Sequence, residues 1–178
     1  IRMNHHGVAW ACFCPTCLGL LAATTGRVFG REELARALEA PCEGGLRRAW
    51  LEQNLHAIEG LLAEVAAAVR RVSPGIRTGL MTCGPAWTTY SGYDYGRWFG
   101  ALGATKARPG GGFYGDEYPI GQYGKALEVG RQCALLPGRA ADRQYELENF
   151  PYTSLGKAAG TVVSECTLAI AAGCNGIA

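Results

Sequence analysis

The 178-residue sequence lacks the features that mark several classes of protein. It has no apolar stretch near the roughly 20 residues that a membrane-spanning helix needs, because Gly, Thr, Arg or Glu interrupts every candidate. Its formal net charge is only +2, and its arginines are scattered rather than set among aromatic residues, as a surface that follows a phosphate backbone requires. We therefore expect a soluble globular protein that binds neither membranes nor nucleic acid.

The sequence also lacks a disulfide framework, because five of its eight cysteines are widely spread. This distribution favours a reducing compartment, so we expect a cytoplasmic protein. The chain begins at Ile1 rather than at methionine, so a signal segment upstream and secretion stay open as the alternative. No internal repeat or low-complexity linker divides the sequence, which predicts one domain over residues 1–178.

The other three cysteines, Cys12, Cys14 and Cys17, lie within the stretch "ACFCPTCLGLL". Disulfides that close such short loops are strained, so a metal site is the better interpretation. Unmetallated thiols are the alternative, and the spacing matches none of the common iron–sulfur patterns.

Alternating strand and helix patterns follow from residue 46 onward. A long amphipathic helix ends at Pro74-Gly75, and strands are predicted at 76–83, 104–109, 143–150 and 174–178, with helices at 94–102, 119–135 and 155–172. The absence of hairpin signals favours a parallel α/β sheet. The four predicted strands are half of the set in a closed (β/α) TIM barrel, which usually needs about 250 residues. We therefore expect part of a larger parallel (β/α) fold, with residues 12–40 as a helical, cysteine-bearing, metal-binding insertion.

Acidic residues lie on an unusual face of the strand in "RQYELENFPY". Alternation places Tyr145 and Leu147 toward the helices, and Glu146 and Glu148 on the opposite side, where an ionised carboxylate is costly unless it is paired or used. Glu148 comes last, at the end of the strand where parallel α/β folds place their active sites. One alternative is that Glu148 is simply a surface residue at the end of a strand. Another is that Glu146 is the residue with a shifted pKa, or the partner in a structural ion pair.

Aromatic and polar residues occupy the predicted loops 85–90, 110–118 and 149–154. Aromatic faces beside carboxylates and amides suit a sugar ring, although such residues also cap barrels for structural reasons. The candidates for sugar contact are Trp87, Tyr114, Asp116, Glu117, Asn149 and Tyr152.

The motifs "CFCPTC", "LGLL", "LENFP" and "AIAAGCNGI" together resemble the zinc-containing β-galactosidases of glycoside hydrolase family 42 and their barrel relatives. The resemblance implies a (β/α)₈ barrel of which this chain is the C-terminal half, and a retaining mechanism with Glu148 as nucleophile. It also implies that Cys12, Cys14 and Cys17 bind structural zinc. The family's fourth ligand lies upstream, so His5, His6 or Cys42 are possible substitutes.

Two features depart from that family. Its Asn-Glu acid/base pair is missing, and we expect the acid/base carboxylate upstream of residue 1. Arg2, His5, His6 and the loop "GFYGDEY" do not match its signatures, which leaves the specificity for β-galactosides open. Arg2, His5 and His6 are nevertheless candidates for sugar contact or for support of the missing acid, with simple solvent exposure as the alternative.

These observations predict a retaining glycoside hydrolase that acts on a carbohydrate substrate, with zinc and no organic cofactor. The alternative is a non-catalytic zinc-stabilised half-barrel or carbohydrate-binding module. A third possibility is a metal-dependent hydrolase that uses Asp116, Glu117, His5 and His6. Open sheet edges and an exposed apolar face predict a homodimer, or pairing with the missing half-barrel.

Overall fold

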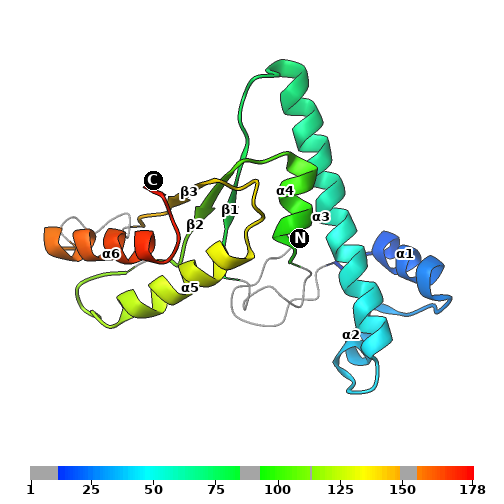
Figure 1. Ribbon diagram of the computed structural model, residues 1–178. Helices are drawn as coiled ribbons and strands as arrows, with labels where there is room; N and C mark the ends of the chain where they lie inside the picture. Colours follow the sequence, from blue (N-terminus) through cyan, green and yellow to red (C-terminus); the bar gives the residue numbers. More distant parts are fainter. Residues whose placement is uncertain (1–11, 85–92, 113, 149–155) are drawn as a thin grey trace. The chain divides into compact units, whose positions relative to one another are not determined.

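The computed structural model describes residues 12–84, 93–112, 114–148 and 156–178 (Figure 1). Residues 12–61, with Tyr93 and Asp94, form one compact unit, and the other described residues form a second. The assignment of the whole chain to one domain stays a prediction. Among the described residues, no helix has both the length and the apolar character needed to cross a bilayer.

The first unit is helical and contains α1 (Pro15–Thr25), α2 (Arg31–Glu39) and the first part of α3 (Gly44–Val72). Pro15 begins α1 where its missing N–H costs nothing, and Gly26 ends the helix with a positive φ of 70°. Residues 12–40, expected to be helical, thus contain two helices. Their apolar faces pack with α3 around Leu21, Phe29, Leu34, Leu38, Leu46 and Trp50.

The second unit contains a four-stranded sheet and the remaining helices. The strands are β1 (Gly79–Thr82), β2 (Lys106–Pro109), β3 (Asp142–Tyr145) and β4 (Gly176–Ile177), and the helices between them are α4 (Tyr95–Leu102), α5 (Gly121–Leu135) and α6 (Ala159–Ala171). All three strand pairs are parallel, and the strands neighbour one another in chain order. The predicted parallel α/β architecture is therefore confirmed.

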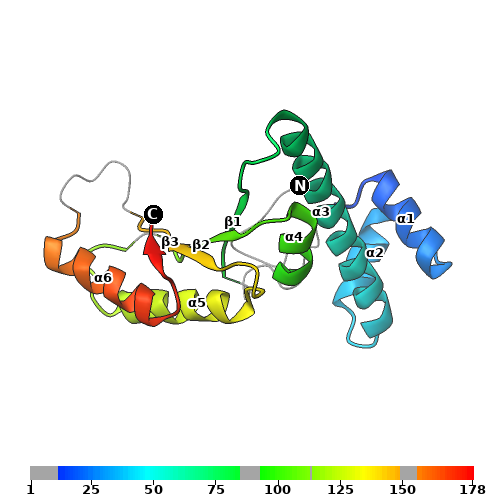
Figure 2. The same ribbon diagram turned by 45° about the horizontal axis from the view of Figure 1, so that its top comes forward.

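Helices α5 and α6 lie side by side against one face of β3, as both views show (Figures 1 and 2). Tyr145 of β3 is buried between them with Val129 and Ala169, and Leu147 packs against the same cluster. Cys133 and Cys174 complete this core, with their sulfur atoms 3.8 Å apart. The predicted orientation of Tyr145 and Leu147 toward the helices is confirmed.

The regular strands are shorter than the sequence pattern predicts, above all β3, which ends at Tyr145 instead of residue 150. The backbone N–H groups of Glu146 and Leu147 still donate to Pro109 and Ala178, at 2.8 and 3.1 Å. The regular ladder stops because its neighbours end there: β2 ends at Pro109, which has no N–H, and β4 ends at Ile177.

Candidate functional site

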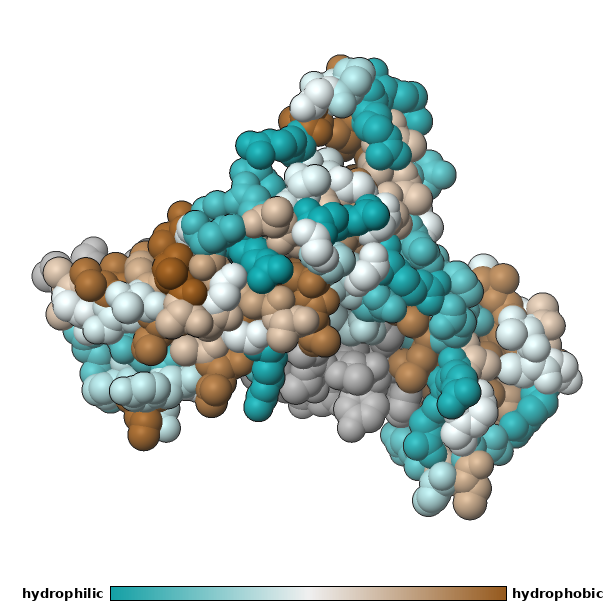
Figure 3. Space-filling view, in the orientation of Figure 1, coloured by the Kyte–Doolittle hydropathy of each residue, from teal (hydrophilic) through white to brown (hydrophobic). Residues whose placement is uncertain are grey.

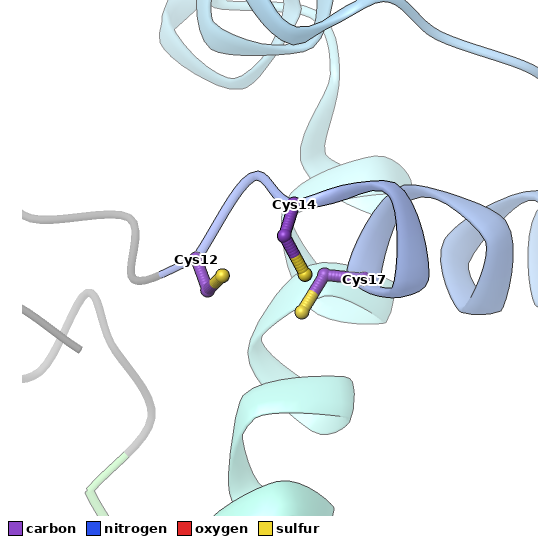
Figure 4. Close-up of side chains that lie close together, drawn as sticks. All are labelled: Cys12, Cys14 and Cys17. Atoms are coloured by element: carbon purple, nitrogen blue, oxygen red, sulfur yellow. The ribbon is translucent and has the colours of Figure 1, made fainter.

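Cys12, Cys14 and Cys17 lie together at the start of α1 (Figure 4). Cys14 is the residue that caps the helix and Cys17 lies in its first turn, and the three sulfur atoms are within 4.8 Å of one another. Thiolates bound tetrahedrally to zinc at about 2.3 Å stand about 3.8 Å apart, so the cluster can close on such an ion with small side-chain movements. In the described part of the chain this is the only such group of metal-ligating residues, and Cys42 does not belong to it.

Contacts with α3 fix the cysteine segment. The ring of Phe13, between the first two cysteines, stacks on Trp50 with 5.3 Å between centroids. The side-chain amide of Gln53 donates to the carbonyl oxygen of Cys17 at 3.0 Å. Both ends of the cluster are thus attached to one helix, which organises the sulfur atoms in advance of a metal.

The local environment separates the acidities of the thiols. The backbone N–H of Cys17 and the thiols of Cys12 and Cys17 lower the pKa of Cys14 to about 7. Burial and the two neighbouring thiols raise the pKa of Cys17 to about 12. Cys14 therefore forms a thiolate more readily than Cys17, and a bound cation would stabilise the thiolate form of both.

Charged side chains line the face of the sheet opposite α5 and α6. Glu146 pairs with Arg108 of β2 at 2.5 Å, and Asp142 pairs with Lys106 at 2.8 Å. Burial and the charge of Glu148 raise the pKa of Glu146, although Arg108 opposes them. The expected placement of an acidic set on this face is therefore found for Glu146, which is ion-paired.

Glu148 lies three residues beyond β3 and is half-buried. Its carbonyl oxygen accepts a hydrogen bond from Nζ of Lys157 at 2.8 Å. The same ammonium group donates to Oε2 of Glu165 at 2.5 Å. The segment that carries Glu148 is thus joined to the start of α6.

Glu165 is the centre of a buried polar cluster between α5, α6 and β3. Its Oε1 accepts from Nζ of Lys125 at 2.8 Å and from the hydroxyl of Tyr145. Burial alone would raise the pKa of Glu165, but the hydrogen bonds from Lys125, Lys157 and Tyr145 lower it below its ordinary value. Burial and the Glu165 carboxylate together raise the pKa of Tyr145.

The predicted sugar-contacting residues of the loop after β2 are placed differently from one another. Asp116 accepts the backbone N–H of Ala158, at the N-terminus of α6, at 2.7 Å. The Thr161 hydroxyl and this N–H lower the pKa of Asp116. Tyr114 is half-buried, with Nζ of Lys157 5.7 Å from its ring centroid, whereas Glu117 is exposed. Asp116 therefore joins the loop after β2 to α6.

The remaining candidates lie outside the described residues, namely Arg2, His5, His6, Trp87, Asn149 and Tyr152. Sequence reasoning in turn missed Lys125, Lys157 and Glu165. A signal for Glu165 was present, because it is the single charged residue between Ala159 and Ala172 in an otherwise small and apolar helix.

Comparison of the chain with protein-family models, with curated proteins and with solved structures finds no match.

Proposed function

We propose that this chain is the C-terminal half of a TIM-type barrel of a retaining glycoside hydrolase, with Glu148 as the nucleophile. The strand order supports the barrel, because four parallel strands that neighbour one another in chain order form the arrangement of half a (β/α)₈ barrel. In a doubly wound sheet, the spatial order of the strands would instead reverse part-way across the sheet.

The observation that carries the proposal is the position of the acidic segment after β3. Glu146 lies on the face away from the helices, which would line the interior of a closed barrel. Glu148, two residues further, directly follows Leu147, whose backbone N–H still donates to the carbonyl oxygen of Ala178 at the carboxyl end of the sheet. Barrel enzymes place their catalytic side chains at this end.

In the retaining mechanism, a carboxylate oxygen of Glu148 would form a bond to the anomeric carbon while the glycosidic C–O bond breaks. A second carboxylate, about 5 Å away, would give its proton to the leaving oxygen and then take one from a water molecule. The oxygen of that water would bond to the anomeric carbon as the bond to Glu148 breaks. The family resemblance assigns this second carboxylate to chain upstream of Ile1. Asn149 and Tyr152 would position the sugar.

Zinc is the metal that we propose for the cysteine cluster. Three cysteine sulfurs close together at the start of α1 suit a closed, structural site, in which zinc takes four soft or imidazole ligands. His5 or His6 is the proposed fourth ligand. The ion would stabilise the fold of α1 against α3 and take no part in the reaction.

The test is covalent labelling with 2-fluoro glycosides that carry a dinitrophenyl leaving group, which departs without acid assistance. We expect an adduct that peptide mapping places on Glu148 and that Glu148→Gln abolishes. Glu146→Gln is the matched control, two residues away in the same segment after β3, and retains labelling. A folded wild-type chain that forms no adduct, or an adduct on Glu146, would contradict the proposal; the first result favours the non-catalytic, zinc-stabilised half-barrel or carbohydrate-binding module.

A further inference from the structure

Lys157 makes two hydrogen bonds that serve different purposes. Its Nζ donates to the carboxylate of Glu165 at 2.5 Å and to the backbone carbonyl of Glu148 at 2.8 Å. The side chains of Lys157 and Glu165 are only 4% and 3% exposed. The proposed nucleophile is therefore attached, through its backbone, to a buried ion pair.

Charge balance does not require this second lysine. Glu165 is already paired with Nζ of Lys125, which is equally buried, and it also accepts the hydroxyl of Tyr145. One buried carboxylate needs one cation, and a further buried ammonium adds a desolvation cost. What distinguishes the two lysines is that Lys157 also reaches Glu148.

Neighbouring groups restrict the position of the Lys157 side chain. The ring of Tyr114 lies 5.7 Å from its Nζ, and Asp116 accepts the N–H of the next residue, Ala158. Both come from the loop after β2, so Lys157 connects the loops that follow two adjacent strands. Its ammonium group thus has few other positions to occupy.

We propose that Lys157 is a positioning residue that fixes the backbone of Glu148, and with it the carboxylate, at the carboxyl end of the sheet. A hydrogen bond to the carbonyl of Glu148 restricts rotation of the peptide group that follows its Cα. Attack at an anomeric carbon depends on the approach of the carboxylate, and a displacement of about 1 Å can cost a hundredfold in rate. This inference rests on the proposed role of Glu148 as nucleophile.

The test compares Lys157→Met with Lys125→Met. Each variant removes one buried ammonium group and leaves Glu165 paired with the other, so both should fold. Only the first removes the hydrogen bond to Glu148. Hydrogen exchange of the peptide that contains Glu146 to Glu148 reports the restraint directly, and the labelling rate reports its effect on the reaction.

We expect Lys157→Met to speed exchange in this peptide by about tenfold and Lys125→Met to leave it within twofold of the wild type. Lys157→Met should lower the first-order rate constant of labelling by about ten- to a hundredfold with an unchanged dissociation constant for the glycoside. If Lys157 only stabilised the fold, the two substitutions would change the rates of exchange and of labelling alike. Equal effects in the two variants, or no effect of Lys157→Met, would overturn the inference.

If Lys157→Met does not fold, Lys157→Gln replaces it, because glutamine is one atom shorter and cannot reach Glu148 and Glu165 together. If the wild type forms no adduct, the proposed function fails. The exchange measurements then still decide whether Lys157 holds this segment, so the two failures are distinguishable.

Discussion

Gln132 of α5 binds both polar groups of the Gly110 backbone. Its Nε2 donates to the carbonyl oxygen of Gly110 at 2.5 Å, and its Oε1 accepts the N–H of Gly110 at 3.3 Å. The same Oε1 accepts the hydroxyl of Thr82 at the end of β1, at 2.8 Å. One fully buried side chain therefore fixes the point where the chain leaves β2 and begins the loop that carries Tyr114 and Asp116.

Gln132→Leu should destabilise the second unit strongly. The substitution leaves three buried polar groups without their partner, and each such group costs about 1–3 kcal/mol. We expect the free energy of unfolding, measured in urea, to fall by at least about 3 kcal/mol. Thr82→Val, which removes one of the three hydrogen bonds, is the matched control and should cost about 1 kcal/mol. Equal losses in the two variants would show that Gly110 is held by other contacts.

Glu165→Gln should be among the most destabilising single substitutions in α6. It removes the only carboxylate that pairs with Lys125 and Lys157 within the buried cluster, and breaking a buried ion pair costs about 3–5 kcal/mol. Arg131→Gln removes an exposed ion pair with Glu128 on α5 and should change stability by less than about 1 kcal/mol. Urea unfolding of both variants measures the difference, and a small loss in Glu165→Gln would contradict the ion pairing.

Two carboxylates predict opposite responses of stability to pH. The pKa of Glu165 is lowered in the folded state, so the unfolded chain binds its proton more tightly and this contribution to stability is lost as the pH falls below the ordinary value of 4.5. The pKa of Glu146 is raised, so its contribution decreases as the pH rises through the same range. The stability gap between wild type and Glu165→Gln should therefore narrow on acidification. On acidification, the free energy of unfolding of Glu146→Gln should fall relative to that of the wild type. Urea unfolding at several pH values tests both trends.

The parallel α/β architecture could be predicted because its signals are local. The four–three spacing of apolar residues from Leu51 to Val72 marked α3, and Pro74-Gly75 marked its end. Strand ends were less predictable. Glu146 and Leu147 continue the alternation of Tyr145, yet the regular strand stops because β2 and β4 have already ended, which is information from other segments.

The site was predictable only where its residues lie close together in the sequence. Cys12, Cys14 and Cys17 lie within six residues at the start of α1, so their spacing in the sequence brings the sulfur atoms together. Asp116 was predicted to contact sugar because it lies in a polar, aromatic loop, but its structural partner is 42 residues away at Ala158. The pairing of Lys157 with Glu148 and Glu165 likewise depends on how α6 packs against β3.

Exposed apolar side chains on α5 and α6 predict self-association. Leu127 and Val163 are 66% and 65% exposed, and hydrophobic residues are visible on the surface of these helices (Figure 3). Among the described residues, β1 and β4 are the edge strands of the sheet, and edge strands favour pairing with another chain. Light scattering of the wild type at micromolar concentration should give twice the mass of the chain. Leu127→Glu should lower the measured mass more than the control substitution Leu61→Glu on α3 does. A monomeric wild type would contradict this prediction.

Removal of zinc should unfold the start of α1 while leaving the parallel sheet folded. Protein purified under reducing conditions should contain about one zinc per chain. Cys14→Ser or Cys17→Ser should lose this zinc, because the loss of one cysteine leaves too few ligands for a closed, four-coordinate site. Cys42→Ser is the matched control: Cys42 is exposed and lies outside the cluster, so the zinc content should not change.

Since ligation requires thiolates, zinc release by a chelator should become faster as the pH falls. Elemental analysis gives the zinc content, and hydrogen exchange should show loss of protection in α1 but not in β2 or β3. Equal zinc content in wild type and Cys14→Ser would exclude this site.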